Sequence, residues 1–314
     1  MNTKHPFVVG LGELLWDLLP AGKQLGGAPA NFAHHAHQLG ARSAVISRVG
    51  NDPAGVEIHQ RLTRMGVDTG TISIHPTLPT GSVTVEVDST GLPKYEIHAP
   101  VAWDEIQAGS AAIQTVGMAD AIVFGSLAQR SPVSRQAIQS FLESAPAKSL
   151  RVFDINLRQH YFSPEIIEQG LKAAHVLKLN DEELTVLGPL MGLRGSEREQ
   201  LKQLMDAYPL QYVALTRGAR GSVLCSVNAV SEVPGLPTSV VDTVGAGDAF
   251  TACLTLGLLC GWGLDRINRR ANELAAFVCS CAGATPDLPP AMNKWFDYPS
   301  PIHARTDTVR REVE

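Results

Sequence analysis

Short apolar runs alternate with longer amphipathic stretches along most of the chain. Six of these runs have the length and composition of buried strands, at residues 7–11, 44–49, 121–124, 151–155, 176–179 and 212–216. Helices are predicted to begin after Pro29, Pro53, Pro132, Pro164, Asp181, Ser196, Gly247 and Leu264. This alternation predicts an α/β fold in which a mainly parallel sheet is covered by helices on both faces.

One region departs from this alternation of strands and helices. Residues 81–87 alternate between polar and apolar positions, residues 89–93 supply a turn and residues 94–98 alternate again, which predicts a β-hairpin. Segment 14–24 is expected to add one or two strands. Such a patch would cover a binding site as a lid, built from residues 14–26 and 78–102. The alternative is an edge hairpin of the main sheet.

Composition narrows the class of protein. The chain has 314 residues, of which 44% are hydrophobic, enough for a sizeable core. Its formal net charge is −5, which argues against a nucleic-acid-binding face. The longest apolar run, residues 249–260, is shorter than the roughly 20 residues that span a bilayer. We therefore expect a single domain over residues 1–314, without membrane or nucleic-acid partners.

The cysteines and histidines suggest no metal centre. Five cysteines occur in the chain, at Cys225, Cys253, Cys260, Cys279 and Cys281. Their spacing matches no zinc motif, and the first residues show no signal-peptide pattern, so we expect buried free thiols in a reducing cytoplasm. His34, His35 and His37 share one predicted helix and are expected at the surface or the edge of the core.

Residues 242–250, DTVGAGDAF, carry the clearest chemistry. Gly245, Ala246 and Gly247 are small enough to bring backbone N–H groups close to a ligand. The following segment is predicted to be helical, so these groups would lie at a helix N-terminus, which attracts phosphate. Asp248 then places a carboxylate beside the anion site, where it can serve as a base. A phosphate cradle with an adjacent base indicates phosphoryl transfer to a hydroxyl group.

Two earlier segments are suited to binding a polyol. Residues 26–31, GGAPAN, combine a glycine pair with Pro29 in the first turn of a helix, from which Asn31 would project. Asp17 follows an apolar stretch and can accept two hydroxyl hydrogen bonds. An ordinary strand-to-helix turn and a solvated loop acid are the alternative interpretations of these segments.

Three further segments follow predicted strands, where ligands bind in such sheets. Arg158, in DINLR, can hold an anionic oxygen or form a surface salt bridge. Asn180 and Glu183 lie one turn apart at a helix start, where they can organise water around Mg²⁺ or simply complement the helix dipole. Residues 216–221, TRGARG, can line the phosphates of a nucleotide.

Taken together, these segments resemble the PfkB, or ribokinase-like, family of carbohydrate kinases. The matching motifs occur in the expected order over nearly the whole chain: residues 26–31, Asn180 with Glu183, and residues 242–248. Within the family, residues 26–31, 154–158 and 101–104 look most like fructokinases. The resemblance implies a three-layer α/β/α fold with a small β-sheet lid.

The resemblance also implies roles for the matching residues. Asp248 would take the proton from the sugar hydroxyl, while the amides of Gly245, Ala246 and Gly247 would form an anion hole for the migrating phosphoryl group. The sugar would be held by Asp17, Gly27, Asn31 and Arg158. ATP would be contacted by Asn180, Thr216, Gly218, Gly221 and Asn272.

Metal requirements follow from the same resemblance. Mg²⁺ would accompany ATP near Glu183, and Asp242 with the carbonyl of Val244 matches the monovalent-cation site of many members. Cys279 and Asp287 occupy the stretch that completes this site. The match at Asp242 and Val244 implies K⁺ as a further cofactor.

The resemblance favours D-fructose as the substrate. A 2-keto-3-deoxygluconate kinase or a ribokinase is the alternative within the fold, with His98 and Trp103 as candidate determinants in the lid. Two further alternatives are a nucleoside kinase and a non-catalytic sugar-binding regulator. The intact residues of the expected base and anion hole argue against the regulator. An exposed lid edge would pair with a second copy, so we expect a homodimer.

Overall fold

The computed structural model describes residues 5–19, 22–87 and 93–296. A nine-stranded sheet runs in the order β13-β12-β11-β10-β9-β8-β1-β4-β5. Its strands are β1 (Phe7–Leu11), β4 (Arg42–Gly50), β5 (Ile72–His75), β8 (Ala121–Phe124), β9 (Leu150–Asp154), β10 (Val176–Asn180), β11 (Tyr212–Thr216), β12 (Ser222–Ser226) and β13 (Val230–Val233). All pairings from β5 to β11 are parallel and the last two are antiparallel, so the predicted mainly parallel sheet is confirmed.

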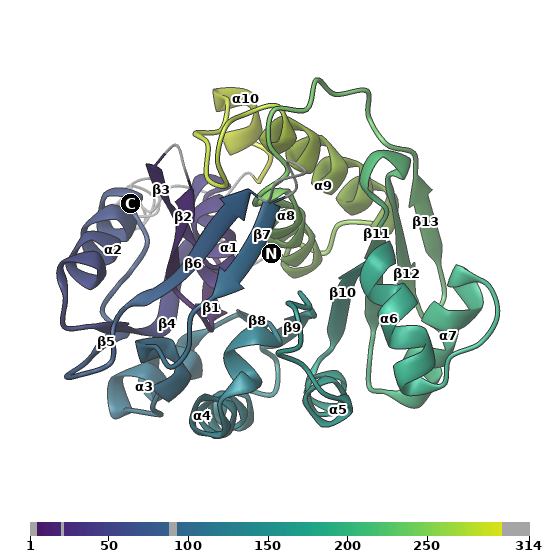
Figure 1. Cartoon of the computed structure of the whole chain (residues 1–314). Coiled ribbons are helices and arrows are strands. Elements are labelled where there is room, and N and C mark those ends of the chain that lie inside the picture. Colours follow the sequence, from purple (N-terminus) through teal and green to yellow (C-terminus); the bar gives the residue numbers. More distant parts are fainter. Residues whose placement is uncertain (1–4, 20–21, 88–92, 297–314) are drawn as a thin grey trace, which may run out of the picture.

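Helices cover both faces of this sheet (Figure 1). One layer contains α1 (Ala28–Gln38), α2 (Pro53–Arg64), α8 (Ala246–Leu259) and α9 (Leu264–Cys279). The other contains α3 (Ser110–Met118), α4 (Pro132–Ser144), α5 (Pro164–Ala173), α6 (Asp181–Met191) and α7 (Glu197–Ala207). Because side chains alternate along a strand, Val8 of β1 packs in the core beneath the first layer and Val9 beneath the second. The result is the three-layer α/β/α arrangement.

Four shorter helical segments complete the described fold: the 3₁₀ turns Ala102–Glu105, Leu127–Arg130 and Gly218–Arg220, and α10 (Pro290–Asn293). Helix α8 is the most deeply enclosed element near the site, since every residue from 249 to 257 is buried. A helix that is apolar on all sides can be stable only in such a position. The core therefore anchors α8 directly after its half-buried N-terminus, residues 245–248.

The predicted hairpin belongs to a separate four-stranded sheet, in the order β3-β2-β6-β7, so the alternative of an edge hairpin on the main sheet is wrong. Its strands are β2 (Leu15–Leu19), β3 (Gly22–Gly26), β6 (Gly81–Val87) and β7 (Pro93–Ile97). The first two form an antiparallel pair from the segment expected to add strands. Residues 88–92 of the predicted turn lie outside the described residues.

Buried polar contacts join the small sheet to the large one. The Arg130 guanidinium donates to both carboxylate oxygens of Asp104, at 2.7 and 2.9 Å, and to the carbonyl of His98, at 2.7 Å. The Tyr161 hydroxyl donates to the carbonyl of Ile97 at the end of β7, at 3.2 Å. The end of β7 is therefore anchored to the loops that follow β8 and β9.

The expected burial of the cysteines is only partly correct. Of the five thiols, Cys225 and Cys253 are buried. Cys260 ends α8 and is exposed, while Cys279 and Cys281, at and beyond the end of α9, are half-buried. A helix end reaches solvent even when the apolar helix before it does not, which explains the difference.

The histidines were expected at the surface or the edge of the core, and two of them are buried. His34 and His35 are 3% and 0% exposed, because residues 284–288 cover this side of α1. The Nε2 atom of His35 lies 2.9 Å from the carbonyl oxygen of Ala284. Burial lowers the pKa of the two imidazoles, to about 4 for His34 and about 3 for His35.

Candidate active site

The carboxyl ends of the central strands converge on the N-termini of α1 and α8. Strand β1 lies between β4 and β8, so the order of strands reverses there, and ligands of open α/β sheets bind beside such a reversal. Across this region the Nδ2 atom of Asn31 donates to Oδ2 of Asp248 at 2.8 Å. Two predicted site residues, 217 positions apart in the sequence, are therefore in direct contact.

The start of α1 depends on the glycine pair. Gly27 has φ = 111°, and a Cβ atom there would lie 2.5 Å from the carbonyl oxygen of Glu13. Only glycine fits this conformation and this space. Oε1 of the buried Glu13 accepts a hydrogen bond from the amide of Ala28, at 3.2 Å, and so caps the helix. Asn31, one turn into α1, is thereby directed at Asp248.

The start of α8 has the backbone geometry expected of a phosphate cradle. Gly245, the residue before the helix, has φ = 79°, and Ala246, Gly247 and Asp248 make up the first turn. The first N–H groups of a helix have no partner within the helix and favour an anion. On Gly245 a Cβ atom would lie 2.3 Å from the carbonyl oxygen of Ala284, so the backbone here also requires glycine.

The electrostatics of Asp248 suit a base that works near neutrality. Burial and the nearby carboxylate of Asp154 raise its pKa to about 7. The hydrogen bond from Asn31 and the positive charges of Lys178 and Arg158 act in the opposite direction. A general base is most effective when its pKa lies close to the working pH.

This pKa leads to an expected pH profile. We expect kcat/KM for the sugar to rise by about tenfold per pH unit below about pH 7 and to level off above it, because only ionised Asp248 can accept a proton. Measurement from about pH 5 to about pH 9 checks this. Asp17, whose pKa is raised to about 6, also titrates in this range, so Asp17→Asn is the control. A profile in Asp17→Asn that is flat between about pH 5.5 and about pH 8 would contradict the assignment.

Asp17 and Arg158 belong to different parts of the fold and are close enough to interact electrostatically. Asp17 lies on β2 of the small sheet, and its carboxylate fills the space beside Gly26, where a Cβ atom would meet Oδ2 at 2.4 Å. Burial raises its pKa and the charge of Arg158 opposes the rise. Arg158 is exposed in the loop after β9, in which Asn156 and Gln159 have positive φ values of 44° and 48°. Strained backbone of this kind is typical of functional loops.

Asn180 and Glu183 form a complete capping box at the start of α6. The amide of Glu183 donates to Oδ1 of Asn180 at 2.7 Å, and the amide of Asn180 donates to Oε2 of Glu183 at 2.8 Å. Oε1 of Glu183 accepts from the amide of Leu157 at 2.9 Å, which ties the loop carrying Arg158 to this turn. Both carboxylate oxygens of Glu183 are therefore engaged by backbone amides.

This geometry limits how the protein could hold Mg²⁺. Within the described ranges, no group of three or more His, Cys, Asp or Glu side chains is placed to bind a metal ion. Magnesium commonly keeps several waters and binds mainly through substrate phosphates. Both carboxylate oxygens of Glu183 already accept from backbone amides, so this side chain would meet a Mg²⁺ ion accompanying ATP only through water.

The predicted nucleotide residues lie along neighbouring strand ends. Asn180 and Thr216 are register partners at the ends of β10 and β11, and Gly218 and Gly221 shape the turn into β12. Gly221 is buried at φ = 87°, where a Cβ atom would lie 2.0 Å from the carbonyl oxygen of Val233. Its immediate role is thus to let two backbones approach. Asn272, on α9, donates to the Ser222 hydroxyl at the start of β12.

Asp242 shapes the turn before the cradle. Its Oδ1 accepts from the amide of Val244 at 3.0 Å, and its Oδ2 from the amide of Gly283 at 3.1 Å. The carbonyl of Cys279 in turn accepts from the amide of Asp242, at 3.2 Å. Asp287 faces His34, whose pKa its charge affects. The residues around Asp242 therefore join residues 242–245 to the end of α9.

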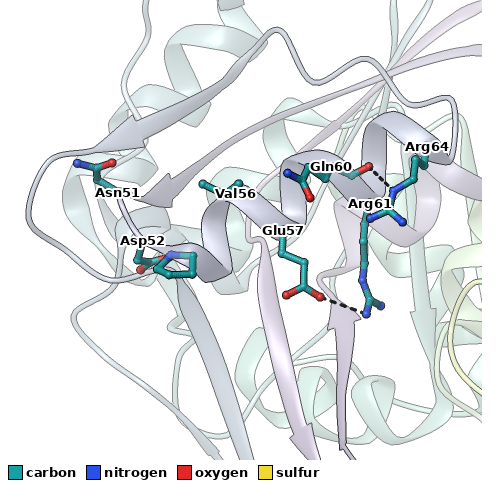
Figure 2. Close-up of a pocket in the computed structure, with 8 residues that line it drawn as sticks. Asn51, Asp52, Val56, Glu57, Gln60, Arg61 and Arg64 are labelled. Carbon is teal, nitrogen blue, oxygen red and sulfur yellow. Dashed lines mark hydrogen bonds and ion pairs between the residues drawn. The ribbon is translucent and has the colours of Figure 1, made fainter.

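A hollow on the outer side of α2 lies apart from these residues. Figure 2 shows its lining by α2 and the loop before it, with Glu57 paired to Arg61. Lys23 of β3 also pairs with Glu57 and, with Arg61, stacks on the ring of Trp16. The contacts are typical of a surface that supports the small sheet.

Sequence reasoning missed three buried polar residues at the site. Glu13 caps α1, Lys178 lies 3.0 Å from the carboxylate of Asp154, and Thr251 donates to the other oxygen of that carboxylate, at 2.7 Å. The available signal was chemical: a lysine within the apolar run VLKLN and an acid within the buried strand β9 have to be paired when buried.

The contact between Asn31 and Asp248, beside the glycine turn at the start of α8, is compatible with a phosphotransferase that uses an alcohol group as acceptor. The family model for pfkB family carbohydrate kinases matches residues 21–291. This chain belongs to the PfkB family of carbohydrate kinases and is a sugar kinase.

Relatives of known sequence and structure agree with this assignment. A fructokinase of Escherichia coli is 30% identical, over 89% of this chain and 95% of its own length. An uncharacterized sugar kinase from Pyrococcus horikoshii, solved in complex with ATP, is 30% identical with a TM-score of 0.77 and covers 88% of this chain and 94% of its own. A Vibrio cholerae fructokinase variant with fructose, ADP and potassium bound is 27% identical with a TM-score of 0.75, over 92% and 97% of the two chains.

The helices of the described residues are all too short or too polar to cross a membrane.

Proposed function

We propose that this protein is a fructokinase, which transfers the γ-phosphoryl group of ATP to D-fructose and forms D-fructose 6-phosphate. The contact between Asn31 and Asp248 carries the proposal, since it joins the sugar-side helix to the catalytic helix. Fructose is favoured because the Escherichia coli relative is named a fructokinase and the Vibrio cholerae structure holds fructose. The alternative substrates are 2-keto-3-deoxygluconate and ribose.

The sugar would lie between the small sheet and the start of α1. Oδ1 of Asn31 is buried without a hydrogen-bond partner in the described part of the chain, so it is available to accept from a sugar hydroxyl. Asp17 can accept two further hydroxyl hydrogen bonds, and the close backbone at Gly27 lets the sugar approach. Arg158 supplies a positive charge near both carboxylates, whose pKa values it lowers.

Chemistry would occur at the first turn of α8. Ionised Asp248 accepts the proton of the attacking hydroxyl group, and the amides of Gly245, Ala246 and Gly247 stabilise charge on the migrating phosphoryl group. Bound ATP supplies that phosphoryl group, and Mg²⁺ neutralises charge on its phosphates. The remaining nucleotide contacts would come from Asn180, Thr216, Gly218, Gly221 and Asn272. Asp242 and the carbonyl of Val244 are the candidate ligands for K⁺.

The small sheet would serve as a lid that keeps water from ATP while the sugar is bound. Its strands β3 and β7 are edge strands, and unpaired edges tend to pair with another chain. We therefore propose a homodimer formed through the lid, in the cytoplasm. Light scattering is expected to give twice the mass of one chain, and a monomer at assay concentrations would contradict this.

The proposal is tested by ADP formation from ATP and Mg²⁺ with a panel of acceptors, each with and without K⁺. The panel comprises fructose, ribose, 2-keto-3-deoxygluconate, glucose, adenosine and fructose 6-phosphate. We expect fructose to have the largest kcat/KM. Preference for another member would keep the mechanism and reject the substrate. Sugar binding without ADP formation across the panel would reject the catalytic proposal.

A further inference from the structure

Lys178 is a buried cation at the centre of the site. It lies on β10 with a side chain only 8% exposed, directly beside Asp154 of β9 in the parallel register. Its strand neighbours Leu177 and Leu179 face the opposite side of the sheet, into the core beneath α3–α7. The ammonium group therefore points toward α8. A charge in such a position has to be paired, because burying it alone is costly.

The ion pair that Lys178 forms with Asp154 connects to α8. Nζ of Lys178 lies 3.0 Å from Oδ1 of Asp154, whose side chain is 6% exposed. Oδ2 of Asp154 accepts from the Thr251 hydroxyl at 2.7 Å. The same hydroxyl lies 3.0 Å from the carbonyl oxygen of Gly247, one turn earlier in α8. The chain of contacts thus runs from the sheet to the last glycine of the anion hole.

The ammonium group also approaches that glycine directly. A Cβ atom on Gly247 would lie 3.0 Å from Nζ of Lys178, so the lysine occupies the space beside the cradle backbone. The positive charge of Lys178 acts to lower the pKa of Asp248, and it interacts electrostatically with the carboxylate of Glu183. A fixed positive charge in a buried site acts over several ångströms with little screening by water.

We propose that Lys178, held in place by Asp154 and Thr251, is a positioning residue that fixes the anion hole and supplies a permanent positive charge behind it. The proposal rests on phosphoryl transfer at residues 245–248. The charge would stabilise the phosphoryl group as negative charge redistributes in the transition state. It would act on turnover more than on sugar binding.

Asp154 and Lys178 have opposite effects on the catalytic base, which gives a readout beyond activity. The pKa of Asp248 is raised by Asp154 and lowered by Lys178, Arg158 and the Asn31 hydrogen bond. Two other titratable groups interact electrostatically with this network. Glu183 interacts with Lys178, and Glu13 interacts with Asp154 and Arg158. Removing one member of the pair should therefore move the acid limb of the kcat/KM profile, and removing both should largely cancel the movement.

The test uses four variants of the full chain with the best acceptor found. Lys178→Met is expected to lower kcat by about 10²- to 10³-fold, with KM for the sugar within about threefold and the acid limb shifted to higher pH. Asp154→Asn should shift the limb to lower pH. The double variant Lys178→Met/Asp154→Asn removes both buried charges and should keep a low kcat with a limb near that of the parent protein. Thr251→Val should lower kcat by about tenfold.

Thr255→Val is the matched control, since Thr255 is a buried threonine one turn further along α8 that donates to the carbonyl of Thr251. It should leave kcat unchanged. The proposal fails if Lys178→Met keeps kcat within threefold and an unmoved acid limb. If Lys178→Met does not fold, equal kcat and pH profiles for Thr251→Val and Thr255→Val would overturn it. An inactive parent protein would instead reject the proposed function.

Discussion

Asp248→Asn is expected to lower kcat by at least about 10²-fold and by as much as about 10⁴-fold, the range that one general base contributes. An amide cannot accept the hydroxyl proton, yet it has nearly the shape of the carboxylate. The hydrogen bond with Asn31, 2.8 Å in the parent protein, can be retained if the new side chain presents its carbonyl oxygen. KM for the sugar should change little. Steady-state ADP formation with fructose measures both constants.

The same variant is expected to be at least as stable as the parent protein above about pH 7. The pKa of Asp248 is raised in the folded protein, so the unfolded chain gives up this proton at a lower pH than the folded one. Stability therefore falls as pH rises from the unfolded pKa to the folded one, and the neutral amide does not suffer this loss. Thermal denaturation at about pH 8 checks that lost activity is not lost folding.

Asp265→Asn is the control for a general effect of removing an acid at a helix start. Asp265 lies in the first turn of α9 but is exposed, so it shares the helix dipole and not the buried environment. We expect its kcat to match that of the parent protein. Turnover in Asp248→Asn close to that of Asp265→Asn would reject Asp248 as the base.

Most of the fold could be predicted from the sequence because its local signals agree with its burial. The six predicted strands are short runs of mostly apolar residues. Helix starts carry recognisable caps: Asp52 accepts from the amide of Gly55 at 2.8 Å, and Ser163 from that of Ile166 at 3.3 Å. Ser131, predicted in the same way, makes no side-chain cap bond, although the helix begins there. Proline at the first position suffices for that boundary.

Strand β12 escaped prediction although its central residues are apolar and buried. Three other elements that were not predicted lack such signals. Strands β5 and β13 are edge strands with exposed polar positions in ISIH and VSEV, so neither forms an apolar run. Helix α3 begins after Gly109 without a side-chain cap. Pairing with a neighbouring strand, or packing on the sheet, determines these elements, and a single sequence does not reveal either.

The candidate site likewise contains features that a local sequence pattern reveals and features that depend on long-range contacts. Glycines and prolines at sharp turns mark residues 26–31 and 242–248, because backbone geometry restricts which residues fit there. The contacts that tune the site are long-range and leave no local pattern. Lys178 meets Asp154 only because β9 and β10 are adjacent and in register. Ala284 closes on Gly245 only because the segment after α9 returns to the start of α8.

Gly245→Ala is expected to combine a loss of stability with a loss of turnover. Gly245 has φ = 79°, a conformation that costs a residue with a Cβ atom roughly 1–2 kcal/mol. The new Cβ atom would also lie 2.3 Å from the carbonyl oxygen and 2.7 Å from the Cα atom of Ala284, and backbone atoms cannot move aside as a flexible side chain can. The turn before α8 must therefore shift, and the amides of the anion hole must shift with it. Losing one anion-hole donor typically lowers kcat by about 10²- to 10³-fold.

Gly261→Ala separates these two causes. Gly261 follows α8 at its other end with a similar φ of 69°, but nothing lies within 4 Å of a Cβ atom there. It should lower the thermal midpoint through backbone strain alone and leave kcat unchanged. Gly245→Ala should lower the midpoint further and also lower kcat. If both variants keep the parental kcat, the amides at the start of α8 do not hold the migrating phosphoryl group. If only Gly245→Ala loses turnover, the position of the cradle, and not helix stability in general, determines the rate.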